Sequence, residues 1–163
     1  MEDLRKNQIL INTKHFGDIY IEDCKILFFE NGILGYETCK KYVILYNQED
    51  DKNNRISWLQ SIDERDLALP IINPFLIKQD YNPEIEDDLL FNLDDLNDEN
   101  IIVLVSITVT KNADIITANL KAPFIINTET RKGTQVIAQN SDYEVKFNIT
   151  EIFKVNMSKK GDE

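Results

Sequence analysis

The stretch from Thr117 to Ala138 restricts the fold of this chain more than any other, because it joins apolar runs through a proline and a polar loop. Side chains alternate along a strand, and the residues before Pro123 suit that alternation. Pro123 cannot donate a ladder hydrogen bond, so it marks a break between two strands. Residues 124–126 resume the apolar run, and Gly133 is predicted to supply the positive φ of a hairpin turn. The stretch therefore predicts three β-strands, with a break after the first and a hairpin loop after the second.

Short apolar runs separated by turn residues continue through most of the chain. Pro70 and Pro74 indicate that their region lies at a sheet edge or bends sharply. A short helix is expected at residues 87–93, and strands at this spacing favour a sandwich or a barrel. The other expected strands are residues 9–11, 19–21, 25–30, 42–46, 56–62, 67–72, 101–110 and 143–149, with irregular loops at residues 31–37 and 48–55.

The length and charge of the chain limit the class of protein. Its 163 residues suit one domain, which we expect at residues 1–157, with a disordered tail at residues 158–163. The formal net charge is −11, from 29 acids against 18 bases. This balance opposes direct binding to nucleic acid, which depends on Lys and Arg. It favours a basic partner and a free chain that is monomeric.

Compartment and membrane association follow from what the sequence lacks. No apolar run reaches the roughly 18–20 residues of a membrane span, and the first residues lack the apolar region of a secretory signal. Cys24 and Cys39 show neither metal-ligand spacing nor a disulfide framework. We expect a cytoplasmic protein with reduced thiols, with a single disulfide as the less favoured alternative.

The sequence contains no catalytic or cofactor motif. His15 is the only histidine, and no nucleophile motif accompanies it. The five glycines form no phosphate-binding run, and the spacing of a calcium loop is absent. We therefore expect no catalytic residue, no metal and no cofactor. A small acidic enzyme with a carboxylate pair on a β scaffold stays open as an alternative, because any acid-rich chain offers such pairs.

Acidic residues are concentrated in one segment. No Lys or Arg lies between Lys78 and Lys111, and residues 80–99 contain nine acids. One interpretation is a solvated face that aids solubility. The other is a surface that meets a basic partner, because charge of a single sign steers a partner of opposite sign.

An ordered set of short motifs extends over nearly the whole chain. The most specific motif is Asn119-Leu-Lys-Ala-Pro-Phe-Ile-Ile-Asn127, followed by Gln135-Val-Ile137. The other motifs are Phe16-Gly17, Phe29–Glu37, Trp58–Ser61, Asn73–Phe75 and Asp80-Tyr81. In these motifs and in their order, the chain resembles the FliW family of flagellar assembly factors.

The resemblance implies a single-domain antiparallel β-barrel-like fold with at most one or two short helices, and no enzymatic activity. It also implies two partners, flagellin and the small RNA-binding translational repressor CsrA. In such a system flagellin holds the FliW protein while it accumulates in the cytoplasm. After flagellin is exported, the freed protein binds CsrA and removes it from flagellin mRNA, so translation resumes. A chaperone that serves flagellin alone is an alternative.

The residues that contact a partner do not follow from the family motifs. Trp58, Gln60, Asn119, Pro123 and Asn127 are expected to define the barrel rather than to bind. Charge indicates a different set, formed by acids of the acidic segment and by one acid in the glycine-flanked loop. The predicted partner-binding residues are Glu37, Glu84, Glu86, Asp87 and Asp88.

Overall fold

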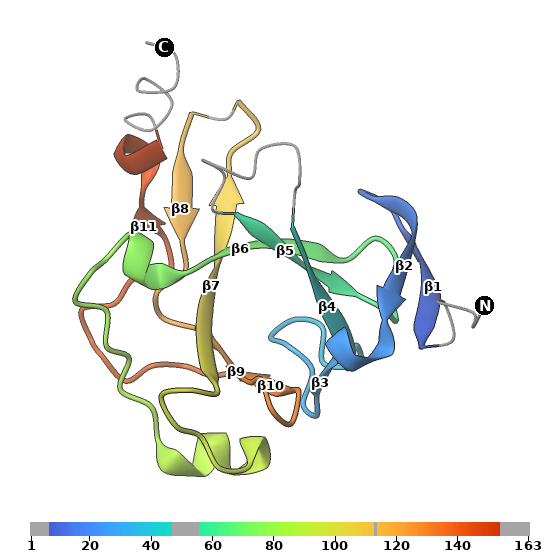
Figure 1. The fold of residues 1–163 in the computed structure, drawn as a ribbon. Coiled ribbons are helices and arrows are strands. Elements are labelled where there is room, and N and C mark those ends of the chain that lie inside the picture. Colours follow the sequence, from blue (N-terminus) through green and yellow to red (C-terminus); the bar gives the residue numbers. More distant parts are fainter. Residues whose placement is uncertain (1–6, 47–55, 113, 154–163) are drawn as a thin grey trace.

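A computed structural model describes residues 7–46, 56–112 and 114–153 of the chain. The expected loop at residues 48–55 and the expected tail at residues 158–163 lie outside the described residues. The chain forms a β-barrel with a separate hairpin on one side and longer connections wrapped around the other side (Figure 1). Within the described ranges, no helix is both long enough and apolar enough to cross a membrane.

Nearly all regular structure is β. The hairpin consists of β1 (Gln8–Thr13) and β2 (Gly17–Glu22). The barrel strands are β3 (Leu27–Phe29), β4 (Lys41–Tyr46), β5 (Ser57–Ser61), β6 (Ala68–Ile72), β7 (Ile101–Val109), β9 (Phe124–Asn127) and β10 (Lys132–Gln135). Two short strands, β8 (Ile116–Ala118) and β11 (Phe147–Asn148), continue the sheet from the far end of β7. Among the described residues, the 3-10 segments are η1 (Asp23–Lys25), η3 (Pro74–Leu76) and η4 (Asp87–Leu93), and a helix begins at Thr150.

The barrel closes through β7, the longest strand. The order is β7-β6-β5-β4-β3-β10-β9, and β9 then pairs with β7 from Ile101↔Asn127 to Leu104↔Phe124. Ser106 and Val105 pair with β6, and residues 107–109 pair with β8, so one strand serves three neighbours in turn. All pairings are antiparallel except that of β3 with β10. The prediction of a mainly β, barrel-like fold is confirmed, and the sandwich alternative is wrong.

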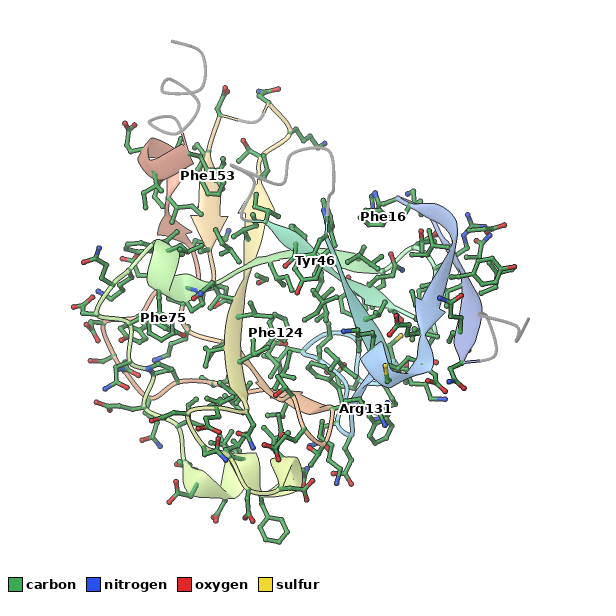
Figure 2. The ribbon with its side chains drawn as sticks, in the orientation of Figure 1. Phe16, Tyr46, Phe75, Phe124, Arg131 and Phe153 are labelled. Carbon is green, nitrogen blue, oxygen red and sulfur yellow. The ribbon has the colours of Figure 1, made fainter. Side chains whose placement is uncertain are left out.

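Aromatic side chains fill the barrel interior. Phe29, Tyr42 and Phe124 are fully buried there, and the Phe29 ring meets the other two edge-on at centroid distances of 5.2 and 6.3 Å. Figure 2 shows Phe124 at the centre of the barrel. Gly133 lies inside β10, where an added Cβ would come within 2.6 Å of the Phe29 ring. The prediction that Gly133 forms the hairpin turn is therefore wrong: Arg131 takes the positive φ of that turn, and Gly133 makes room for an aromatic ring.

Further apolar clusters pack on the outside of the barrel. Val105 and Ile107 of β7 are buried in one of them, against the outer connections rather than in the interior. Tyr81 and Tyr143 stack there with centroids 5.0 Å apart. On the other side the hairpin covers β4, where Val43 is buried in a separate apolar cluster. Side chains alternate across a strand, so β4 supplies Tyr42 to the interior and Val43 to an outer layer.

Two local predictions need correction. Pro70 does not lie on an edge strand, because β6 pairs with β5 on one side and with β7 on the other. Proline is tolerated there because β7 pairs only with Ile71 and Ile72, beyond the proline. The strand expected at residues 143–149 is mostly irregular, and only Phe147–Asn148 pairs with β8. Alternation in that segment reflects packing of Tyr143 and Ile149 into an outer layer, not a ladder.

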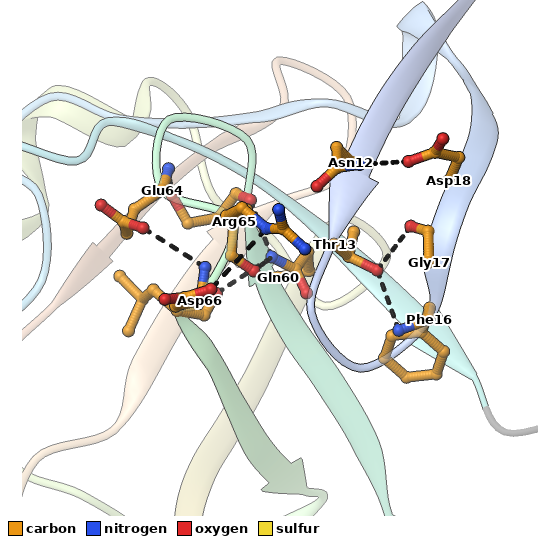
Figure 3. Close-up of polar contacts among 11 residues, drawn as sticks. Asn12, Thr13, Phe16, Gly17, Asp18, Gln60, Glu64, Arg65 and Asp66 are labelled. Carbon is orange, nitrogen blue, oxygen red and sulfur yellow. Dashed lines mark hydrogen bonds and ion pairs between the residues drawn. The ribbon is translucent and has the colours of Figure 1, made fainter.

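Buried polar side chains hold the turns at the hairpin end of the molecule (Figure 3). The Thr13 hydroxyl donates to the Gly17 carbonyl and accepts from the Phe16 N–H, both at 2.9 Å. The Gln60 side-chain amide, which is fully buried, donates to the carbonyls of Ser61, Arg65 and Leu67 at 3.0–3.2 Å. Gln60 therefore defines the β5–β6 turn, as expected for a structural motif residue.

Candidate functional site

The loop at residues 31–37 presents Glu37 through a tight turn. Gly32 has φ +65°, and a Cβ on Gly32 would lie 2.5 Å from the Glu37 carbonyl oxygen, so only glycine fits. The Tyr36 N–H donates to the Ile33 carbonyl at 2.8 Å, and the Leu34 N–H donates to the Gln135 side chain at 2.9 Å. The loop is thus attached to the end of β10 and has a defined shape.

The acidic segment is held against the barrel by amide side chains. Asn127 donates to the Leu93 carbonyl at 2.7 Å and to the Asp95 carbonyl at 3.3 Å, and it lies at the end of β9. Leu93 packs with Ile125 and Val136 in an apolar cluster beneath η4. These contacts explain how a run with so many like charges keeps a fixed place: apolar burial and backbone hydrogen bonds offset the repulsion.

The first part of the acidic segment is attached to residues 136–140. The Glu84 N–H donates to the Asn140 side chain at 2.7 Å, and the Gln139 N–H donates to the Glu84 carbonyl at 2.7 Å. The Gln139 side-chain amide donates to a Glu86 carboxylate oxygen at 2.6 Å. Both glutamates remain exposed to solvent.

A groove of about 290 Å³ lies between the loop, η4 and the end of β10. Glu37 and Asp88, 51 positions apart in the chain, both line it. The structure thus brings two of the five predicted acids together. Glu84 and Glu86 lie along the adjoining segment, and Asp87 precedes Asp88 in η4 but does not line the groove.

The predicted acids carry uncompensated charge. Within the described residues, Lys78 pairs with Asp80 and Lys132 pairs with Asp94, both at 3.1 Å. No ion pair in that part of the chain involves any of the five predicted acids. Exposed carboxylates without a cation are available to a partner that supplies one.

Sequence reasoning missed the apolar component of this surface. Leu34, Leu89 and Ile137 line the groove although they are 51%, 42% and 49% exposed, and Phe91 of η4 is 85% exposed. Isolated exposed apolar residues are common, whereas a group of them around one groove is a feature typical of interaction sites. The sequence offered a signal in Leu89-Leu90-Phe91, which follows directly on Asp87-Asp88 in an otherwise polar run.

The histidine, the cysteines and a second cavity lie outside the groove. His15 stacks on Trp58 with centroids 5.4 Å apart, and both cysteines are free thiols. Among the described residues, no group of three or more His, Cys, Asp or Glu side chains has the arrangement of a metal site. A second cavity of about 500 Å³ is lined by Tyr46 and Arg131, which are labelled in Figure 2. Among the described residues, β3 does not pair with β4 beyond Tyr42 on this side.

The chain is similar to proteins of one family over nearly its whole length. The family described as FliW protein matches residues 9–149. A flagellar assembly factor FliW from Lachnoclostridium phytofermentans is 51% identical over 154 residues, which cover 94% of this chain and 98% of the relative. A second, from Lachnospira eligens, is 45% identical over 145 residues and covers 88% of this chain and 96% of the relative.

A solved structure shows the same fold. The crystal structure of a flagellar assembly factor FliW superposes with a TM-score of 0.77 at 34% sequence identity. The match covers 86% of this chain and 96% of that structure.

Proposed function

Because this chain belongs to the FliW family, and its relatives are flagellar assembly factors, we propose that it is a cytoplasmic regulatory protein that binds flagellin and antagonises CsrA. In this proposal the protein is not an enzyme, uses no cofactor and is monomeric when free. Release from exported flagellin lets it bind CsrA, which frees flagellin mRNA for translation.

The observation that carries the proposal is the exposed, unpaired acidic surface on a FliW fold. A repressor that holds RNA needs basic residues, since RNA binding depends on neutralising phosphates. An acidic protein docked beside such a surface repels phosphate over the roughly 8 Å that salt leaves unscreened. Glu37, Glu84, Glu86, Asp87 and Asp88 are the residues proposed to meet the partner.

A gel-shift assay tests the proposal. CsrA from the same organism is bound to a labelled leader of the flagellin mRNA, and the purified chain is added. Release of free RNA, reversed when flagellin is added, is the expected result. Binding to flagellin without release of RNA would instead favour the alternative of a flagellin chaperone.

Charge reversal tests the proposed surface. Replacing Glu86, Asp87 and Asp88 with Lys should weaken CsrA binding by about tenfold or more at low salt, and by less at high salt. The matched control reverses three other exposed acids, Asp114, Glu144 and Glu151. Equal affinities for the two triple variants at both salt concentrations would refute the role of this surface.

The remaining alternative is a small acidic enzyme on a β scaffold. An enzyme that uses a carboxylate pair would turn over a substrate without either partner. A pull-down from cytoplasm that recovers neither a small basic RNA-binding protein nor flagellin would favour that enzyme over the proposed regulator.

A further inference from the structure

We propose that the groove between the residue 31–37 loop, η4 and the end of β10 binds an amphipathic, cationic α-helix of a partner protein. The inference deepens the proposed function, and rests on it for the biology of the partner. Its physical basis is the combination of apolar side chains inside the groove with carboxylates on its wall, namely Leu34, Leu89 and Ile137 with Glu37 and Asp88.

The backbone around the groove argues against an added strand as the occupant. β10 already pairs with β3 on one side and β9 on the other. Beyond it, the N–H groups of Val136, Ala138 and Gln139 donate to Pro123, Lys121 and Glu84 carbonyls at 2.7–3.1 Å. An extended peptide gains affinity mainly by pairing with a free strand edge, and this edge is occupied. A helix satisfies its own backbone and binds through side chains alone.

The apolar side chains suit one face of such a helix. The loop, η4 and the end of β10 each contribute one exposed apolar residue to the groove, so a helix lying in it would cover all three. Residues i and i+3 eclipse in a 3-10 helix, which places Phe91 on the same row of η4 as Asp88. Phe91 does not line the groove but is 85% exposed, so it is available to pack against the flank of a helix bound there.

The charge of the groove selects a cationic helix. Glu37 and Asp88 line it, and neither forms an ion pair within the described part of the chain. The sequence supplies no Lys or Arg between positions 78 and 111 to neutralise η4 from within its own segment. A helix with Lys or Arg beside its apolar stripe complements both features, whereas an acidic helix meets like charge.

The test uses synthetic peptides, so that it does not depend on flagellin or CsrA. One peptide of about 16 residues carries Leu at helical spacing i, i+3, i+4, i+7 with Lys on both flanks, and a matched peptide carries Glu in place of Lys. Binding to the full chain is followed by amide shifts in NMR spectra. We expect the Lys peptide to shift residues of the groove and to bind at least about tenfold more tightly than the Glu peptide.

Substitutions then locate the site. Changing Leu89 and Phe91 together to Ser should weaken binding of the Lys peptide by about tenfold or more, since buried apolar anchors dominate such interfaces. The control changes Leu10 and Val145 to Ser, which are 56% and 57% exposed and lie outside the groove. The isosteric pair Glu37→Gln and Asp88→Asn should remove the preference for Lys over Glu and leave the fold intact.

Each outcome decides the inference. Equal binding of the two peptides, shifts centred elsewhere, or equal losses in the groove and control variants would overturn it. If the peptides behave as expected and the chain releases no RNA from CsrA, the groove stands and the proposed function fails. If RNA is released but the groove variants bind and act like the unmodified chain, the function stands and the groove assignment fails.

Discussion

Replacement of Asn127 by Ala should destabilise the fold and loosen the acidic segment. The Asn127 side chain is 1% exposed and makes four hydrogen bonds with backbone groups. It donates to the carbonyls of Leu93 and Asp95, and it accepts from the N–H groups of Glu129 and Thr130 at 2.9 and 3.2 Å. One side chain therefore joins the end of η4 to the β9–β10 hairpin.

The magnitude follows from the geometry. Each buried hydrogen bond contributes about 0.5–1.5 kcal/mol net, and a buried partner left unsatisfied costs more. Two of the four bonds are longer than 3.1 Å and count at the lower end of that range. We expect the free energy of unfolding to fall by about 2–4 kcal/mol.

Urea denaturation measures this loss. Asn119→Ala is the matched control, because within the described residues the half-buried Asn119 side chain accepts two bonds, from the Lys121 and Ala122 N–H groups at 3.1 Å. It should lose about 1–2 kcal/mol. A loss at Asn127 below about 1 kcal/mol, or no larger than at Asn119, would refute the claim that this side chain anchors η4. Asn127→Ala should also weaken binding of the Lys peptide, although Asn127 does not line the groove.

Other substitutions test the barrel interior and the loop. Tyr42→Phe should leave stability unchanged or raise it, because the buried Tyr42 hydroxyl has no hydrogen-bond partner among the described residues. Tyr81→Phe should cost about 1 kcal/mol, because it removes a 2.8 Å hydrogen bond to the Leu120 carbonyl. Thermal melts of the two variants measure both effects. Burial raises the pKa of both phenols in the folded chain above that in the unfolded chain. Their contribution to the free energy of unfolding is therefore fully present below about pH 10 and is lost as the pH rises above that value. Absorbance titration should show both tyrosines ionising only as the chain unfolds. Gly32→Ala should displace Glu37 and abolish peptide selectivity, while Gly35→Ala, with no atom within 4 Å of the added Cβ, should cost only backbone strain of about 1–2 kcal/mol. NMR spectra of the two variants separate these effects.

Local patterns predicted most of the strands. The alternation in β7 and the apolar runs of β4 and β5 lie where the sequence places them, because side-chain period is a local property. Gly133 was misplaced for the opposite reason. Glycine is required at position 133 because the Phe29 ring fills the space of a Cβ. Phe29 lies about a hundred positions away in the sequence and becomes a neighbour of Gly133 only in the folded barrel.

The candidate site shows the same division. The run without bases, which is visible in the sequence alone, indicates Asp88, and the glycine-flanked loop indicates Glu37. Neither signal identified Leu34 or Ile137 as partners of that charge, since apolar residues in loops and strands read as core. Only the fold reveals that they stay exposed around one groove.

The sequence by itself determined most of the strands, the acidic segment and, through the motif from Asn119 to Asn127, the family. Tertiary structure decided the closure of β9 on β7, the parallel pairing of β3 with β10 and the groove. The physical reason is range. Backbone alternation and turn chemistry act over a few residues, whereas closure and grooves depend on packing between segments that the sequence separates by tens of residues.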